Sequence, residues 1–184
     1  MYYKIRFWIP LGITITLLCG LIYVATHQVL RQSANDPQIA MSEDIGETLS
    51  NQGAPAIDTK PIELVTSLSP FVIIYDSSGN VVSSTATLHG KIPQLPKGVL
   101  EFAKANNQNR LTWQPESGVR EAVVVTYYTN NKGGSGYVLV GRSLRETEQR
   151  VSMLLWKVGL GWIVTMVASL LGVLLLVQPP AKKK

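Results

Sequence analysis

The side chains best suited to bind a small molecule are concentrated in the middle of the chain. They combine aromatic rings with a guanidinium and a hydroxyl group: Tyr75, Trp113, Arg120, Thr126, Tyr128 and Tyr137. Ligand pockets are mostly apolar with a few polar groups in fixed places, and an arginine can hold a carboxylate bidentately. We predict a ligand site in which Arg120 lies beside Trp113. In the alternative interpretation, the rings fill the core and Arg120 is a solvated strand end.

Residues suited to catalysis are sparse. The two histidines, His27 and His89, lie at the edge of an apolar segment and in an expected loop, whereas a zinc site needs a denser cluster of ligands. Asp76 and His89 could be combined with a serine, but no serine has the sequence of a nucleophile elbow. The glycine-rich stretch 131–136 lacks the spacing of a P-loop and indicates a hairpin turn. We expect no enzyme activity, no metal and no cofactor.

The net charge of +5 belongs to the ends of the chain. All 12 Asp and Glu lie between His27 and Met153, where 11 Lys and Arg nearly balance them. Nucleic-acid binding would need a basic face on this middle part. We therefore expect no nucleic-acid partner.

Two apolar segments, 7–26 and 154–177, flank the middle part. About 20 apolar residues cross a bilayer as a helix, and Trp156 and Trp162 suit its interface. The first segment is too long for a signal-peptide core and lacks a cleavage site. Cys19 within it is interpreted as a small buried hydrophobe, with lipoprotein-type acylation as the alternative. Because basic residues flank both segments on their chain-terminal sides, the positive-inside rule predicts a two-pass protein of the cell membrane with cytoplasmic termini.

The middle part shows helix and strand patterns in turn. Apolar spacing predicts an amphipathic helix over 37–51 and a short helix over 97–106. Strands rich in β-branched and aromatic residues are predicted at 71–75, 81–85, 110–114, 120–129 and 135–140. Several strands are apolar at both parities, which indicates that both faces of the sheet are covered. We expect the 37–51 helix on one face, and the short helix with its loops on the other.

A continuous helix is predicted from Leu144 into the second apolar segment. Ser143 and Glu146 form a capping box, and apolar residues continue at helical spacing. The rod would be on the order of 50 Å long and could carry a small displacement. The predicted signal-transmitting residues are Ser143, Leu144, Glu146, Val151, Leu155 and Val158.

These patterns divide the chain into successive parts. They are an N-terminus (1–6), a first anchor (7–26), a helical stalk and linker (27–60), an outer domain (61–142), a connecting helix (143–153), a second anchor (154–177) and a tail (178–184).

Four stretches of the chain carry a resemblance to a known family. PFVIIYDSSGNVVSS, KIPQLPKGVLEFAK, TWQPESGVREAVVV and GYVLVGRSLRETEQR, which leads into the second anchor, together resemble the extracytoplasmic PAS-like (PDC or Cache-type) sensor region of bacterial sensor histidine kinases. The resemblance covers about 61–177. It implies an α+β fold, with a curved antiparallel sheet and flanking helices between two transmembrane helices, a ligand pocket on one face, and a homodimer. No HAMP linker, phosphoacceptor helix or ATP-binding domain follows the second anchor in this sequence, so the resemblance leaves the output undefined.

The expected function is that of a membrane-anchored sensor. A ligand- or partner-induced displacement would pass through the second anchor to a separate protein, such as a histidine kinase or another membrane signalling protein. Two alternatives stay open: a membrane scaffold or assembly factor whose outer domain binds another protein, and a truncated sensor kinase. The predicted partners are the bilayer, a second copy of the chain, a signalling protein and a small molecule of unknown identity.

Overall fold

The computed structural model describes residues 2–33, 35–52, 60–131 and 133–177. The chain divides into two compact units. The helical unit comprises Met1–Leu30 and Gln149–Lys184, and the sheet unit comprises Arg31–Glu148. The predicted tail, 178–184, lies outside the described residues.

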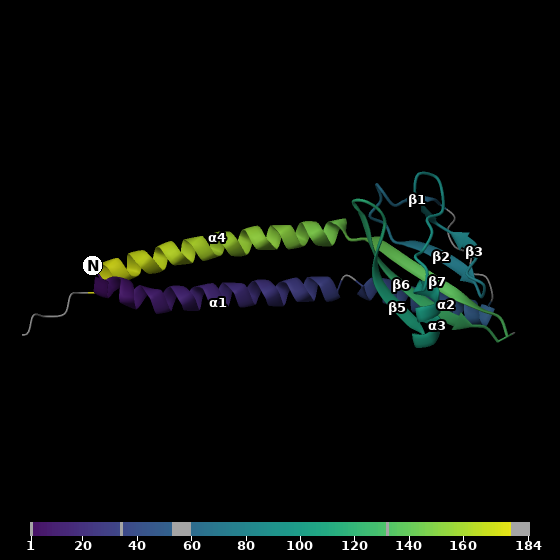
Figure 1. The fold of residues 1–184 in the computed structure, drawn as a ribbon, viewed down its shortest axis with the longest axis horizontal. Coiled ribbons are helices and arrows are strands. Elements are labelled where there is room, and N and C mark those ends of the chain that lie inside the picture. The colour runs from purple at the N-terminus through teal and green to yellow at the C-terminus, as the bar shows by residue number, and fades with distance from the viewer. Residues whose placement is uncertain (1, 34, 53–59, 132, 178–184) are drawn as a thin grey trace, which may run out of the picture. The chain divides into compact units, whose positions relative to one another are not determined.

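The sheet unit is built on five antiparallel strands (Figure 1). They are β2 (Phe71–Asp76), β3 (Val81–Ser84), β5 (Gln108–Glu116), β6 (Val119–Thr129) and β7 (Ser135–Ser143). Their order is β3-β2-β7-β6-β5, so β7 is central and pairs with both β2 and β6. All five occupy the predicted positions, and β5 and β7 extend beyond the predicted ends. A separate parallel pair, β1 (Ile62–Glu63) and β4 (Ala86–Thr87), was not predicted, because two residues are too few to show a period.

One face of the sheet is covered by α2 (Asp36–Gln52), close to the predicted 37–51 helix. Its apolar side packs on β2 and β7, where the buried residues are Leu49, Val72, Ile74, Val138 and Val140. Helix α2 also lies over β6, where Gly46 faces Thr126 and Tyr128. We call this side of the sheet the α2 face.

The other face is covered by α3 (Val99–Asn106) and the segment before it. Helix α3 begins two residues later than predicted, because Gly98 is its N-cap with φ of 86°. The larger core cluster lies here: Leu64, Phe71, Ile73, Tyr75, Ala86, Val99, Ala103, Trp113, Val119, Val123, Val125, Tyr137 and Leu139. The prediction that both faces are covered is confirmed. We call this side the α3 face.

The helical unit consists of most of α1 (Tyr2–Gln32) and α4 (Arg145–Leu176). The two helices run antiparallel and touch through polar side chains (Figure 1). Trp8 Nε1 donates to Ser169 Oγ at 3.1 Å, and Trp162 Nε1 donates to Thr16 Oγ1 at 3.0 Å. Both helices are long and apolar enough to cross a membrane.

The helices run across two of the divisions that composition sets along the chain. Helix α1 continues from the first apolar segment into the first residues of the predicted helical stalk, to Gln32. Helix α4 is continuous from Arg145 through 153 and 154, as the helix predicted from Leu144 into the second apolar segment requires. Ser143 belongs to β7 rather than to a connecting helix. Intrahelical hydrogen bonding continues wherever no helix-breaking residue intervenes, so a change from apolar to polar composition does not end a helix.

Candidate functional site

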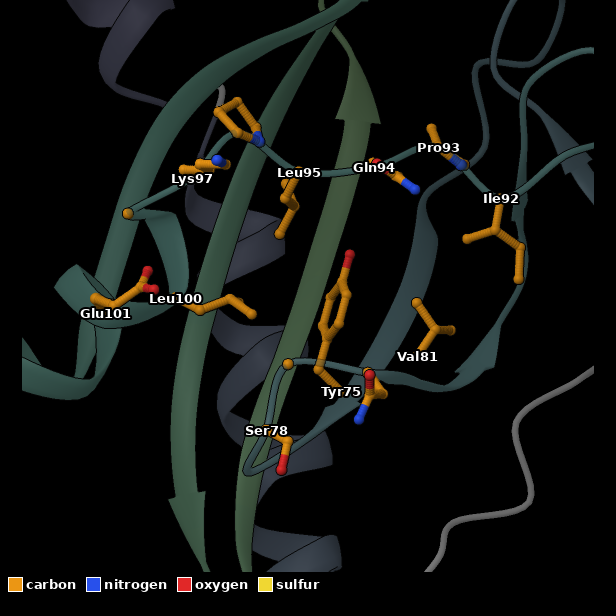
Figure 2. A pocket seen from close by; sticks show the side chains of 14 residues that line it. Tyr75, Ser78, Val81, Ile92, Pro93, Gln94, Leu95, Lys97, Leu100 and Glu101 are labelled. Atoms are coloured by element: carbon orange, nitrogen blue, oxygen red, sulfur yellow. The ribbon is translucent and has the colours of Figure 1, made fainter.

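A groove of about 530 Å³ lies on the α3 face, between the end of β2 and the segment that leads into α3 (Figure 2). The β2–β3 hairpin supplies one wall, and the segment 92–98 with the start of α3 supplies the other. Its lining residues are Tyr75, Ser78, Gly79, Asn80, Val81, Ile92, Pro93, Gln94, Leu95, Pro96, Lys97, Gly98, Leu100 and Glu101. The volume falls in the range of small-molecule sites.

Tyr75 provides the most distinctive polar group of the groove. The residue is 4% exposed, and its hydroxyl oxygen is buried without a hydrogen-bond partner among the described residues. Burial raises the pKa of Tyr75, so the phenol stays neutral. Figure 2 shows the hydroxyl pointing toward the segment of Gln94 and Leu95. Because a buried polar group normally has a partner, this hydroxyl can donate to or accept from a molecule in the groove.

The hairpin wall of the groove is fixed by Asp76. Its Oδ1 accepts the backbone N–H groups of Ser78 and Asn80, both at 2.8 Å. The backbone N–H of Asn80 contributes most to lowering the pKa of Asp76, followed by the Asn80 side chain. Gly79 takes φ of 84° and faces the Leu100 side chain from α3. The turn and α3 are therefore held together at the margin of the groove.

The opposite wall carries exposed charges of both signs, on Lys97 and Glu101. Below them, Tyr137 on β7 lies beside Tyr127 with ring centroids 5.4 Å apart. Burial raises the pKa of Tyr137, with smaller contributions from Tyr127 and Glu101. The groove thus combines the Tyr75 ring with a polar margin, which suits binding. The described lining includes no histidine or cysteine that could act as base or nucleophile.

The six residues predicted to bind a ligand do not gather in one place. Tyr75, Trp113 and Tyr137 belong to the core of the α3 face, and only Tyr75 lines the groove. Tyr128 packs under α2, on the α2 face. Thr126 Oγ1 also faces α2, 2.9 Å from Ser42 Oγ. The aromatic rings therefore mostly fill cores, as the alternative interpretation held.

Arg120 does not lie beside Trp113 in the way we predicted. Trp113 is opposite Glu121 in the β5–β6 ladder, and successive side chains of a strand point to opposite faces. Arg120 therefore points away from Trp113. Its guanidinium is paired with a carboxylate of this chain, that of Glu148 in the first turn of α4.

The start of α4 is tied to the sheet by several contacts. Leu144 is the single residue between β7 and α4, and its N–H donates to the carbonyl of Arg120 at 2.9 Å. Three arginines add side-chain contacts: Arg120 to Glu148, Arg142 to Glu146 at 3.0 Å, and Arg145 to the carbonyl of Val65. Ser143 Oγ accepts the N–H of Arg145 at 3.4 Å, near the predicted cap position.

The remaining residues predicted to transmit a signal, Val151, Leu155 and Val158, lie along α4 in the helical unit.

Sequence reasoning missed Glu121, a buried carboxylic acid near the base of α4. It is 1% exposed, and its Oε1 has no partner among the described residues. Burial raises its pKa to about 7, while Arg145 acts in the opposite direction. The signal available was a carboxylate inside an otherwise apolar strand, VREAVVV.

The sheet unit thus carries a groove on its α3 face, and its last strand, β7, is followed after one residue by α4. The described residues include no cluster of three or more His, Cys, Asp or Glu that could hold a metal ion. No protein-family model matches the sequence, and no curated protein matches it well enough to count as a relative. The assignment of function therefore depends on the geometry of this chain.

Proposed function

We propose that this chain is a membrane-anchored sensor module with a PAS-like outer domain. In this proposal α1 and α4 cross the cell membrane, both termini are cytoplasmic, and the sheet unit lies outside. A ligand or partner bound in the groove displaces β2 and β7, and α4 carries the displacement to a separate signalling protein. The domain has no catalytic activity of its own.

The observation that carries the proposal is the direct continuation of β7 into α4. Strand β7 is the central strand, and five of its residues from Tyr137 to Gly141 are buried. Tyr75, at the groove, is the ladder partner of Tyr137 on β7. Because protein cores are close-packed, a shift of β2 at the groove is passed to its neighbour β7. The contacts of Arg120, Arg142 and Arg145 then pass it into the first turn of α4.

The helical unit supports the membrane arrangement. Many large apolar side chains of α1 and α4 are exposed, as expected of helices that contact lipid. Lys4 Nζ donates to the carbonyl of Leu174 at 2.6 Å, so a cation lies at the carboxyl end of α4. Together with Arg6 and the three final lysines of the sequence, this basic end fits the cytoplasmic side.

A covalent label can stand in for the unidentified ligand. In a Cys19→Ala background, Ser78→Cys is modified with a bulky maleimide that fills the groove. The full chain is placed in lipid nanodiscs with fluorotryptophan, and the ¹⁹F resonances of Trp156 and Trp162 on α4 are recorded. We expect the label at Ser78 to shift these resonances. The same label on Asn51→Cys, on the exposed side of α2, serves as the control and should leave them in place.

The coupling contacts provide a second comparison. Arg120→Ala combined with Arg145→Ala should reduce the response to the Ser78 label without preventing labelling. If the label at Ser78 shifts neither tryptophan resonance in the chain that keeps Arg120 and Arg145, the sensor proposal is wrong.

A second candidate function, a scaffold that binds another protein, is favoured by the edge strand β3. Val81 is 39% exposed and Val82 is 65% exposed, and an extended peptide can add a strand to such an edge. Proximity labelling from a ligase fused to the N-terminus in living cells separates the two functions. Kinase or response-regulator partners favour the sensor, whereas components of a cell-envelope machine favour the scaffold.

A further inference from the structure

Glu121 occupies an unusual position at the base of α4. On β6, it lies opposite Trp113 of β5 and Ser143 of β7 in the two ladders. The Trp113 ring packs against Phe71, with centroids 6.5 Å apart, so this corner of the α3 face is largely apolar. Glu121 is 1% exposed, and Oε1 accepts no hydrogen bond from any described residue. Its ladder partner Ser143 lies two residues before Arg145, the first residue of α4. A carboxyl group is thus buried beside the start of the helix.

The charged groups of the surrounding elements leave Glu121 with one cationic neighbour. Arg145 at the start of α4 is the group whose charge acts on it, and no ion pair joins the two in the structure. The other charged groups nearby have other partners. Glu116 of β5 pairs with His89, and Glu63 of β1 accepts the backbone N–H of His89. Strand alternation places Arg120 and Arg142 on the opposite face, where they pair with Glu148 and Glu146. An ionised carboxylate without a partner is costly in such a site.

We propose that Glu121 is a proton-binding site that makes the attachment of α4 to the sheet unit depend on pH. When Glu121 is protonated and neutral, the Arg145 guanidinium donates to the carbonyl of Val65. When Glu121 releases its proton to water, the new carboxylate attracts the guanidinium away from Val65. Arg145 then exchanges its contact with Val65 for one with Glu121, while the charge on a carboxyl buried in this apolar corner destabilises the packing at the start of α4. The binding of the proton is independent of the proposed function, whereas its use as a signal rests on it.

The direction of the effect follows from linkage. The pKa of Glu121 in the folded chain, about 7, is raised above its ordinary value of 4.5. The folded state in which Glu121 is buried therefore binds the proton more tightly than any state in which water reaches Glu121. Between about pH 6 and about pH 8, opening of this corner should become about tenfold more favourable. Anchoring of α4 is therefore strongest on the acidic side and weakens as the pH rises through neutrality.

Amide hydrogen exchange of the full chain in lipid nanodiscs tests the proposal. After correction for the intrinsic rate, protection of residues 143–150 should fall by about tenfold from about pH 6 to about pH 8. Glu121→Gln and Glu121→Met both remove the proton and should abolish this dependence. Two variants are used so that a folding defect in one leaves the other as the test. Glu47→Gln, on the exposed side of α2, is the matched control and should behave like the unmutated chain.

Infrared difference spectra supply a readout specific to the carboxyl group. The unmutated chain should show a protonated-carboxyl band that disappears as the pH rises, and Glu121→Gln should lack it. Because Arg145 lowers the pKa of Glu121, Arg145→Gln should move the midpoint of this band to higher pH. If the band is missing from the unmutated chain, or the exchange still depends on pH in both Glu121 variants, the proposal is overturned. These measurements concern the sheet unit and the first turns of α4, so they remain valid if α4 transmits nothing to a partner.

Discussion

The two faces of the sheet differ in how completely they satisfy their polar groups. On the α2 face, Ser42 and Thr126 bond to each other, and Gln108 also donates to Thr126. The α3 face has the larger core cluster. Yet both of the buried side-chain oxygens that lack a partner among the described residues, on Tyr75 and Glu121, lie on this face.

This difference distinguishes a face with ordinary packing from a face with unsatisfied buried polar groups. Unsatisfied buried polar groups are expensive, and native proteins concentrate them where function needs them. The α2 face attaches a helix to the sheet with ordinary packing. The α3 face carries an open groove at one end of β2 and a buried carboxyl near the other. Substitutions on the two faces should therefore have different consequences. Four experiments measure the difference.

Phe71→Ala should have the largest effect. The ring is 1% exposed and packs against Trp113 and over Gly141, so its removal leaves a cavity that costs about 3–5 kcal/mol. The free energy of unfolding of the sheet unit is measured by denaturant titration of the full chain in micelles. Trp8, Trp156 and Trp162 are replaced by Phe in all variants, so that Trp113 alone gives the fluorescence signal. Phe102→Ala on α3, where the ring is 54% exposed, is the control. Equal losses for both variants would contradict the assignment of the core.

Adding one methyl group to each face should have opposite effects. A Cβ at Gly141 would meet Phe71 Cζ at 2.2 Å, and this buried ring cannot move freely, so Gly141→Ala should destabilise by about 1–3 kcal/mol. A Cβ at Gly46 would meet Thr126 and Tyr128 no closer than 3.9 Å. Gly46→Ala should therefore stabilise α2 by roughly 0.5–1 kcal/mol. The same titration measures both, and destabilisation by Gly46→Ala would show that the α2 face is packed more tightly than described.

The Ser42–Thr126 contact should contribute about 1 kcal/mol to stability. A double-mutant cycle with Ser42→Ala and Thr126→Val isolates the coupling, since each single substitution leaves one hydroxyl without this partner. Thermal unfolding of the four proteins in micelles gives the coupling energy. Additive effects would mean that the hydroxyl pair does not attach α2 to the sheet.

The smallest effect is expected from Asp76→Asn at the margin of the groove. Hydrogen bonds lower the pKa of Asp76, so its contribution to stability is present above the carboxyl's ordinary pKa and is lost as the pH falls through the lowered value. The melting temperature of Asp76→Asn should therefore lie below that of the unmutated chain at neutral pH, and the gap should close in acid. Asp44→Asn on the exposed side of α2 is the control. A gap that stays constant with pH would argue against the carboxylate's role in the turn.

Much of the fold could be predicted from the sequence because its signals are local. Five strands and the amphipathic helix follow from composition and spacing. The grouping of the site residues could not be predicted in the same way. Placing Arg120 beside Trp113 required knowing the β5–β6 register, and the register puts Glu121 there instead.

The groove was beyond prediction for a related reason. Most of its lining comes from the turn 78–81 and from the segment 92–98, whose conformations depend on contacts with α3 rather than on a repeating pattern. Glu121 could have been noticed as a lone acid in an apolar strand. Only the ladders show that Trp113 and Ser143 flank it and that Arg145 is the cation beside it.

The single-residue junction at Leu144 also fixes the angular phase of α4. Each residue of an α-helix turns the chain by about 100°, so inserting or deleting one residue between Ser143 and Arg145 would rotate every side chain of α4 about the helix axis by more than a quarter turn. The length of this junction therefore sets the angular phase of α4 relative to β7, and homologous chains that keep this phase should keep the same spacing between their last strand and their last helix.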